Sequence, residues 1–283
     1  MRGQAQASQL VVGEFSIDTE STVQYFHPVA SNELFAINES MAVQMVDIDG
    51  FRMLVVDDFY RDPERLRDYL LKSPAPLWKT ALAGRNQLDY WDCRHEHKIV
   101  CDSYAEAQRC IAALARYYLG AVVPRPIEDL STNVLQLQAA RTGRSASVVH
   151  HDGNCLAALV CLNRPEECNG GTGFFRNRFN GVFNIGRLSR LEMKALDDWC
   201  DRNGLREDGR SYFLENWTAW WDLEYLAEMR FNRLLVYPGA IFHAACFDGT
   251  PFTRVPRLNH MMFFNDVQFS RQVEWLRRDE DRA

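Results

Sequence analysis

The sequence contains no apolar run near the length of about 20 residues that a membrane-spanning helix needs. Its N-terminal residues, MRGQAQASQLVVGEFSIDTE, lack the charged and then continuously apolar segments of a secretory signal. Basic residues are also in deficit, since 32 Lys and Arg face 38 Asp and Glu, which gives a net charge of −6. Nucleic-acid binding depends on a basic footprint that such a chain does not have. We therefore expect a cytoplasmic protein that binds neither membranes nor nucleic acids.

Paired cysteines are missing as well. The chain has eight cysteines, but no two form a C-x-x-C pair, so the common structural zinc and thioredoxin-like motifs are not indicated. We interpret these cysteines as reduced thiols in buried or half-buried positions. What the chain does have is 47% hydrophobic residues over a length of 283. That is enough for a sizeable core without covalent or metal staples.

The order of the predicted elements places helices first and strands later. Residues 1–30 are weakly patterned, and residues 1–50 are predicted to form an N-terminal arm. A strand at 54–59 leads into a helix with Asp62 as its N-cap and Pro63 as its first residue. A second helix is predicted over 104–119, and short strands bounded by Gly, Asn and Pro follow. This order favours an α+β fold with a mainly β core, either an antiparallel barrel or a sandwich, supported by the N-terminal helices.

We expect a single domain over residues 51–283, with helical support over about 60–125 and the strand core over about 130–265. A helical insertion is predicted over about 186–230, from RLSRLEMKALDDWC and the aromatic-rich WTAWWDLEYLAEM. In the second segment, Trp217, Trp220 and Trp221 either form a lid over a site or pack the insertion onto the core.

The first segment with chemical potential is VVHHDG. On a strand, successive side chains point to opposite faces, so His150 and Asp152 would share one face and His151 would take the other. An imidazole and a carboxylate at such positions can bind one divalent metal. This pair is a weak signal alone, because a histidine in a strand is more often a structural hydrogen-bonding group.

Two further residues strengthen that signal. His243 follows in the segment YPGAIFHAACF, and two histidines with one carboxylate are the ligand set of non-haem Fe(II), with positions left open for a cosubstrate and dioxygen. Arg257 begins the apolar run RLNHMMFFN, where a lone arginine calls for an anionic partner, ideally a carboxylate. Arg254 is the competing candidate, and we prefer Arg257 because the apolar run would carry it on a strand.

The ordered segments LQLQAAR, VVHHDGN, AALVCLN, NGGTGFFRN, LLVYPGAIFHAACF and RLNHMMFFN resemble the prolyl-4-hydroxylase-like branch of the Fe(II)/2-oxoglutarate dioxygenases. The resemblance covers residues from about 54 to 265. It implies a double-stranded β-helix, or jelly-roll, core with N-terminal helices and a helical insertion. It also implies an oxygenase that hydroxylates a C–H bond of a small-molecule or peptidyl substrate while dioxygen decarboxylates 2-oxoglutarate to succinate.

By the same resemblance, His150, Asp152 and His243 would hold Fe(II), and Arg257 would pair with the distal carboxylate of 2-oxoglutarate. Many relatives carry a tyrosine just before the pair that corresponds to Leu162-Asn163, and this tyrosine helps to hold the cosubstrate. Here that position is Cys161, so a different hydroxyl or a water would complete the contact, or a different acid would bind.

Two alternatives remain open. If His151 were the ligand, the residue two positions further on would be Gly153, a pattern that resembles the non-haem iron halogenases, where a small residue leaves room for chloride. The chain could also be a jelly-roll module that binds a carboxylate without turnover. The sequence indicates neither the substrate nor the oligomeric state.

Other polar residues have weaker claims. The segment His95-Glu96-His97 is interpreted as solvated surface, and His260 as a histidine of the core or of the surroundings of the site. Arg176 and Arg178 follow the Gly-Gly-Thr turn. They are either surface charges or receptors for an anionic substrate at the mouth of the site.

Overall fold

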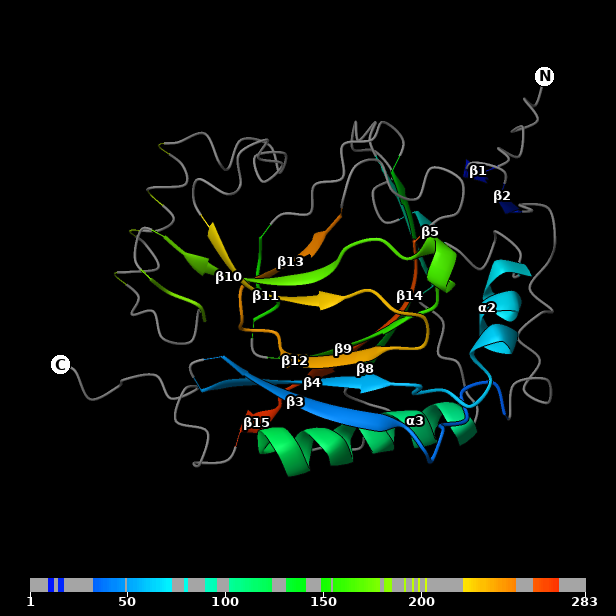
Figure 1. Cartoon of the computed structure of the whole chain (residues 1–283), viewed down its shortest axis with the longest axis horizontal. Helices are drawn as coiled ribbons and strands as arrows, with labels where there is room; N and C mark the ends of the chain where they lie inside the picture. Colours follow the sequence, from blue (N-terminus) through cyan, green and yellow to red (C-terminus); the bar gives the residue numbers. More distant parts are fainter. Residues whose placement is uncertain are drawn as a thin grey trace, which may run out of the picture.

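The computed structural model is mainly β, and its strands pair antiparallel (Figure 1). It describes residues 10–12, 15–17, 33–48, 50–72, 79–80, 90–95, 102–123, 131–140, 149–153, 155–178, 181–184, 221–247 and 257–269, with single helical positions at 191, 195, 198 and 202. Among these residues no helix combines the length and apolar character that crossing a membrane requires.

The larger sheet has eight strands in the order β3-β4-β12-β9-β14-β8-β6-β5. In that order they are β3 (Ala42–Ile48), β4 (Phe51–Asp57), β12 (Leu234–Pro238), β9 (Cys155–Cys161), β14 (Arg257–Asn265), β8 (Ser131–Ala140), β6 (Tyr90–His95) and β5 (Lys79–Thr80). Strands far apart in the sequence are neighbours here, since β12 lies between β4 and β9, and β14 lies between β9 and β8. Strand β9 is buried along nearly its whole length, which explains its continuous apolar run CLAALVC.

The smaller sheet has the strand order β11-β10-β13, with β10 (Gly171–Asn177), β11 (Trp221–Glu228) and β13 (His243–Cys246). An isolated bridge between His150 and His243 continues this sheet beyond β13. Two pairs of short strands lie apart from both sheets: β1 (Leu10–Val12) with β2 (Phe15–Ile17), and β7 (Ala121–Val122) with β15 (Gln268–Phe269).

The two faces of the large sheet pack against different layers (Figure 1). One face, with Val56, Val160 and Leu258, forms a core with helix α3 (Asp102–Leu114) and the π-helical turn η2 (Ala115–Leu119) that continues it. The other face meets the small sheet, where Ala157 and Tyr237 pack with residues of β10 and β11. Helix α2 (Pro63–Lys72) packs against this first core through the buried side chain of Leu66. The space between the two sheets therefore has one wall from each sheet.

The helical predictions before residue 120 are confirmed. Helix α2 begins at Pro63, and the side chain of Asp62 accepts a hydrogen bond from Arg65 N at 3.1 Å, as an N-cap should. Helical residues run from Asp102 to Leu119, against the predicted 104–119. The strand predicted at 54–59 is β4, which begins three residues earlier and ends two residues earlier.

Three segments differ from the expectations. In the segment WTAWWDLEYLAEM, residues 221–228 are not helical as predicted but form β11, which pairs along β10. The pairing with β10, which sequence spacing cannot show, determines this outcome. Residues 42–48, which we assigned to the arm, form β3, an edge strand of the large sheet whose identity comes from its pairing along β4. Residues 149–153 are not a strand, and only His150 makes a bridge. In RLSRLEMKALDDWC the described positions 191, 195 and 198 are helical, as predicted.

Candidate metal centre

Backbone hydrogen bonds fix the His150–Asp152 segment against β13. The amide of His150 donates to His243 O at 2.9 Å, and the amide of His243 donates to His150 O at 2.8 Å. The amide of Asp152 donates to Gly239 O at 2.7 Å, in the turn between β12 and β13. Residues paired directly across an antiparallel bridge carry their side chains on the same face, and the two imidazole ring centroids lie 4.4 Å apart.

His150, Asp152 and His243 each present one ligand atom, and these atoms all lie within 4.8 Å of one another. Asp152 faces both imidazoles: its Oδ2 is 3.2 Å from His243 Nε2, and its Oδ1 is 3.7 Å from His150 Nε2. A metal that binds nitrogen and oxygen at about 2.1 Å places adjacent ligand atoms about 3 Å apart. These three groups are therefore spaced as the ligands of a single metal ion are, and their chemistry fits a divalent transition metal.

His243 is held in the orientation that a ligand needs. Its Nδ1 lies 2.8 Å from Ile241 O. Because a carbonyl oxygen only accepts, Nδ1 must donate its proton there, and Nε2 is directed at Asp152. The ring is also buried, with 4% of the residue exposed. Such an outer hydrogen bond fixes both the tautomer and the ring plane of metal-binding histidines.

The carboxyl of Asp152 is kept ionised by its neighbours. Burial alone would raise its pKa, but the hydrogen bond from His243 and the charges of His243, His150 and His151 outweigh burial, and the pKa is lower than usual. A carboxylate that stays ionised between two imidazoles is ready to bind a cation.

His151 points elsewhere. Its ring packs edge-on to Phe242 with the centroids 5.9 Å apart, and its Nδ1 accepts a hydrogen bond from Gly153 N at 3.1 Å. Phe242 precedes His243 and lies in the hydrophobic cluster on the other face of the small sheet. Of the two adjacent histidines, the structure brings His150 to the carboxylate.

Arg257 begins β14 and is only 5% exposed. The amide of the next residue, Leu258, donates to Asn163 Oδ1 at 2.8 Å, which fixes the start of the strand. The guanidinium carbon lies 5.1 Å from the ring centroid of Phe247. When the side-chain amide of Asn259 is turned so that its oxygen faces Arg257, this oxygen accepts a hydrogen bond from Arg257 Nε at 3.1 Å. No carboxylate in the described part of the chain forms an ion pair with Arg257.

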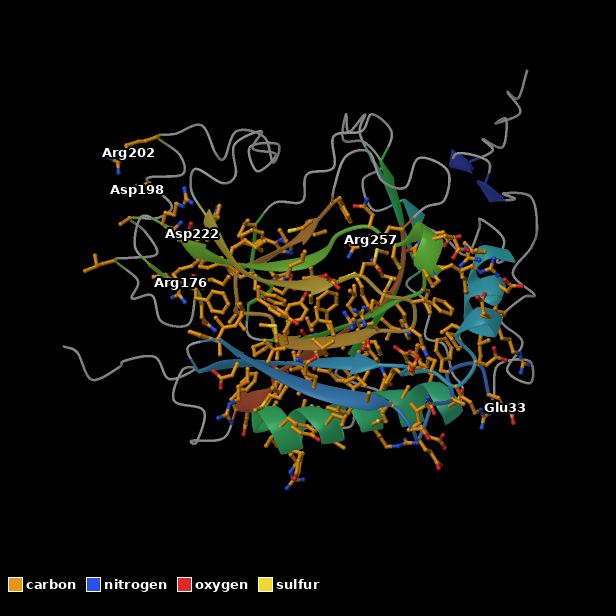
Figure 2. All side chains as sticks on the ribbon, viewed as in Figure 1. Glu33, Arg176, Asp198, Arg202, Asp222 and Arg257 are labelled. Carbon is orange, nitrogen blue, oxygen red and sulfur yellow. The ribbon has the colours of Figure 1, made fainter. Side chains whose placement is uncertain are left out.

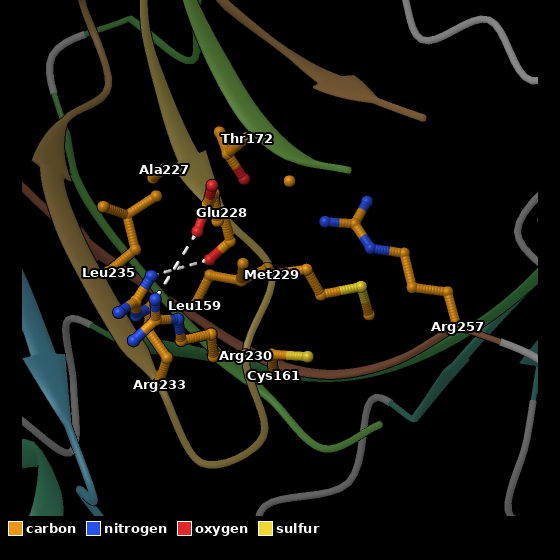
Figure 3. A pocket seen from close by; sticks show the side chains of 11 residues that line it. Leu159, Cys161, Thr172, Ala227, Glu228, Met229, Arg230, Arg233, Leu235 and Arg257 are labelled. Atoms are coloured by element: carbon orange, nitrogen blue, oxygen red, sulfur yellow. Dashed lines mark hydrogen bonds and ion pairs between the residues drawn. The ribbon is translucent and has the colours of Figure 1, made fainter. Parts of the chain in front are cut away.

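Figure 2 shows Arg257 inside the body of the molecule, whereas Glu33 and Arg202 lie at its periphery. Its guanidinium lines a pocket with about 270 Å³ of space not filled by atoms (Figure 3). Across the pocket stand two more arginines, and both have acidic partners. Arg233 binds Asp57 through two contacts of 2.6 and 2.8 Å, and Arg230 lies 3.6 Å from Glu228.

The pocket and the metal-ligand cluster face the same space between the sheets. Strand register puts Arg257 on the same face of the large sheet as Cys161, Leu159, Leu235 and Tyr237. In the small sheet, Thr172 of the pocket is two positions from Phe174, the direct partner of His243, so their side chains share a face. The histidine cluster and the arginine thus stand on facing walls of one interior space.

Cys161, the predicted substitute for a cosubstrate-binding tyrosine, lies in this pocket. It is buried, and burial, followed by its hydrogen bond with Cys168, raises the pKa of its thiol well above the usual value. The side chain is therefore an uncharged thiol at neutral pH, which is a weak hydrogen-bond donor.

Tyr237 is the residue that the sequence analysis missed. It is 3% exposed, and its ring centroid lies 4.8 Å from that of His243. Burial raises the pKa of its hydroxyl well above the usual value, the charges of Asp152 and Cys155 add to this, and Arg257 opposes it. The signal was present in LLVYP, where alternation puts Tyr237 on the face of Leu235 just before the turn that leads to His243.

The other candidates lie outside the cluster. Arg176 of β10 and Arg178, just after its end, form ion pairs with Glu224 at 2.6 Å and Asp222 at 2.7 Å on β11. Trp221 packs against Phe242, with ring centroids 4.9 Å apart, on the face of the small sheet opposite His243. His260 is a core residue whose Nδ1 lies 2.7 Å from Tyr60 Oη. His95 ends β6, and its side chain is outside the described part, as are Arg254, Trp217, Trp220, Glu96 and His97.

Comparisons with known proteins give three kinds of result. The profile of a family of unknown function (DUF6445) matches residues 130–258, a stretch that includes the histidine–aspartate cluster and Arg257. A comparison with curated proteins finds no match. Several solved structures are similar in fold, at low sequence identity.

One similar structure is HygX from Streptomyces hygroscopicus with nickel, 2-oxoglutarate and hygromycin B bound, at 13% identity and a TM-score of 0.42, covering 77% of this chain and 84% of that one. Another is SnoN, a non-haem α-ketoglutarate-dependent epimerase from nogalamycin biosynthesis, at 17% identity and a TM-score of 0.40, covering 91% and 92%. A third is EctD from S. alaskensis with 2-oxoglutarate and 5-hydroxyectoine, at 14% identity and a TM-score of 0.35, covering 93% and 86%. With scores this low, the function has to be argued from this chain's own residues.

Proposed function

We propose that this protein is a non-haem Fe(II)/2-oxoglutarate-dependent oxygenase that hydroxylates a C–H bond of a small-molecule or peptidyl substrate. The observation that carries the proposal is the cluster of His150, Asp152 and His243, whose ligand atoms lie within 4.8 Å of one another. Two imidazoles and one carboxylate on one side of a metal form the ligand set of non-haem Fe(II) oxygenases. A cytoplasmic location without membrane or nucleic-acid partners belongs to the same proposal.

Arg257 supports the choice of cosubstrate. Burying a cationic group without an anion carries a large desolvation penalty, yet Arg257 is 5% exposed and no carboxylate of the described residues pairs with it. A ligand carboxylate would remove that penalty and could bind bidentately. A 2-oxo dicarboxylic acid suits both walls of the interior space, with its 2-oxo acid end at the iron and its distal carboxylate at Arg257.

Strand order supports the jelly-roll assignment. The central run β12-β9-β14-β8 faces β11-β10-β13 with the His150 bridge at its edge, and strands that alternate between two facing sheets are the mark of such folds. We retain a double-stranded β-helix core in the prolyl-4-hydroxylase-like branch, within one domain, as part of the proposal.

In this assignment the chain's own residues have distinct tasks. His150, Asp152 and His243 would hold iron, whose chemistry, when bound, is the activation of dioxygen with decarboxylation of 2-oxoglutarate. Ile241 O keeps Nε2 of His243 available through its 2.8 Å contact with Nδ1. Arg257 would orient the cosubstrate, and the apolar packing between the sheets would shield the inner side of the site, while His150, with 45% of its side chain exposed, lies on its open side.

Two alternatives are disfavoured by position. A halogenase site would use His151 with Gly153, but His151 packs on Phe242 while Asp152 lies between His150 and His243. A carboxylate-binding module without turnover would have no use for a metal-ligand cluster that faces the same space as Arg257.

The test is succinate formation from 2-oxoglutarate in the presence of Fe(II) and ascorbate, with the His243→Ala protein as the matched control. We expect slow, substrate-independent turnover by the natural protein and none by the variant. A natural protein that binds Fe(II) and 2-oxoglutarate but never forms succinate, even with a range of candidate substrates, would favour the binding module.

A further inference from the structure

Tyr237 faces the interior space between the two sheets and packs against the histidine cluster. It lies on the inward face of β12, two positions after Leu235, which lines the pocket of Arg257. Its ring packs nearly edge-on against that of His243, at an interplanar angle of 66°. The charges of both Asp152 and Arg257 act on its hydroxyl. This single side chain therefore touches the metal-ligand cluster and lies within electrostatic reach of the arginine.

Only 3% of Tyr237 is exposed, and its hydroxyl forms no hydrogen bond with the residues that the structure describes, but this oxygen is not one of the fully enclosed polar atoms without a partner. Tyrosine hydroxyls inside proteins usually find a hydrogen-bond partner, so a hydroxyl that still reaches the interior space is suited to donate to a ligand there. Arg257 of β14 donates from Nε to the Asn259 amide oxygen at 3.1 Å, but no carboxylate of the described residues pairs with its guanidinium. A phenol and a guanidinium on one face of the large sheet can both donate hydrogen bonds to one anionic ligand.

Among the residues that line the Arg257 pocket, none on the wall of the large sheet carries a hydroxyl. Cys161, which occupies the position before the Leu-Asn pair, presents an uncharged thiol that hydrogen bonds with Cys168. Thr172 lines the pocket from the opposite sheet. A phenol is protonated at neutral pH and donates a stronger hydrogen bond to an anion than a thiol does.

We propose that Tyr237 is a cosubstrate-binding residue, whose hydroxyl donates a hydrogen bond to the same distal carboxylate that Arg257 holds. This inference rests on the proposed function, because it assumes a 2-oxo dicarboxylic acid as the cosubstrate. In this chain the binding hydroxyl then comes from β12, beside the turn that carries His243, and not from the end of β9 where Cys161 lies.

The experiment measures binding and not turnover. The anaerobic Fe(II) protein is titrated with 2-oxoglutarate, and the visible charge-transfer band of the chelate is followed for the natural protein, Tyr237→Phe, Arg257→Ala and the double variant. Tyr225→Phe is the matched control, because Tyr225 is also in the core between the sheets but its hydroxyl is influenced by Arg233. A second titration uses pyruvate, a 2-oxo acid without a distal carboxylate.

We expect Tyr237→Phe to bind 2-oxoglutarate about tenfold or more weakly, as for a lost hydrogen bond to a charged group, with unchanged Fe(II) affinity. Tyr225→Phe should bind normally, and Tyr237→Phe should bind pyruvate as the natural protein does. In the double variant the two losses should be less than additive, because both donors act on one carboxylate.

Equal 2-oxoglutarate affinity in Tyr237→Phe and the natural protein would overturn this inference and leave the proposed function standing. Equal weakening for pyruvate and 2-oxoglutarate would also overturn it, because the hydroxyl would then act at the iron end. Failure of the natural Fe(II) protein to give any band with 2-oxoglutarate would instead overturn the proposed function.

Discussion

His150 and His243 hydrogen bond to each other through both backbones, with N–O distances of 2.9 and 2.8 Å, although they are far apart in the sequence. This bridge aligns both imidazoles, and the hydrogen bond from Asp152 N to Gly239 O brings the carboxylate to the same point. The cluster is thus assembled by backbone pairing and does not depend on a metal to draw its ligands together. We therefore expect variants of the ligands to fold.

His150→Ala, Asp152→Ala and His243→Ala should each abolish stoichiometric Fe(II) binding, because the described part of the cluster offers no fourth protein ligand. Metal analysis after anaerobic loading and dialysis measures this, and circular dichroism checks the fold. His151→Ala is the control and should retain iron, since its ring packs on Phe242. Full iron affinity in His243→Ala would show the ligand assignment to be wrong, while iron retained by Asp152→Ala together with chloride-dependent product would favour the halogenase.

Arg257→Ala should weaken 2-oxoglutarate binding more than 100-fold while sparing iron. Removing one partner of a buried charge pair typically costs about 3–5 kcal/mol. Arg257→Lys should restore only part of the affinity, because an ammonium cannot make the two-pronged contact. Arg254→Ala should have little effect. If Arg254→Ala weakens the titration and Arg257→Ala does not, the anion is held by the other arginine.

Much of the β core could be predicted from the sequence, because continuous apolar runs such as those of β9 and β14 mark strands buried on both faces. Arg257 could be placed at the start of β14 for the same reason. Strand β11 could not be predicted from the sequence, because its side chains are mostly exposed or half-buried and its identity comes from pairing with β10. Tyr237 was overlooked because its role depends on the facing sheet, which brings His243 against its ring.

Gly170→Ala should destabilise the protein by several kcal/mol, because a Cβ there would lie 1.9 Å from Cys246 O, a backbone atom of β13 that cannot move aside cheaply. Gly181→Ala is the matched control. Both glycines have positive φ, +64° and +70°, but the Cβ at Gly181 would meet nothing within 4 Å. It should therefore cost only the left-handed backbone penalty of about 1–2 kcal/mol. Urea unfolding of both variants measures the difference, and equal losses would show that β10 and β13 are not so closely packed at this point.

His260 should make the stability of the fold fall in mild acid. Burial lowers its pKa from 6.5 to about 3, so between these values the unfolded chain binds a proton at this residue that the folded chain does not. Stability therefore rises with pH across this window and is lost as the pH falls below 6.5. From pH 7 to pH 5 the loss from this one group is about 2 kcal/mol, at about 1.4 kcal/mol for each pH unit below 6.5.

The variant His260→Gln keeps a polar partner for the hydroxyl of Tyr60, which lies 2.7 Å from His260 Nδ1, but it cannot titrate. It should be less stable than the natural protein at pH 7, because a different shape must fit among the rings of Phe35 and Tyr104. Its unfolding free energy should nevertheless fall less between pH 7 and pH 5. Urea unfolding at each pH gives both slopes, and any histidine that titrates elsewhere contributes equally to the two proteins. Identical slopes would mean that the folded protein admits a proton to His260, which its place in the core between β14 and α3 does not allow.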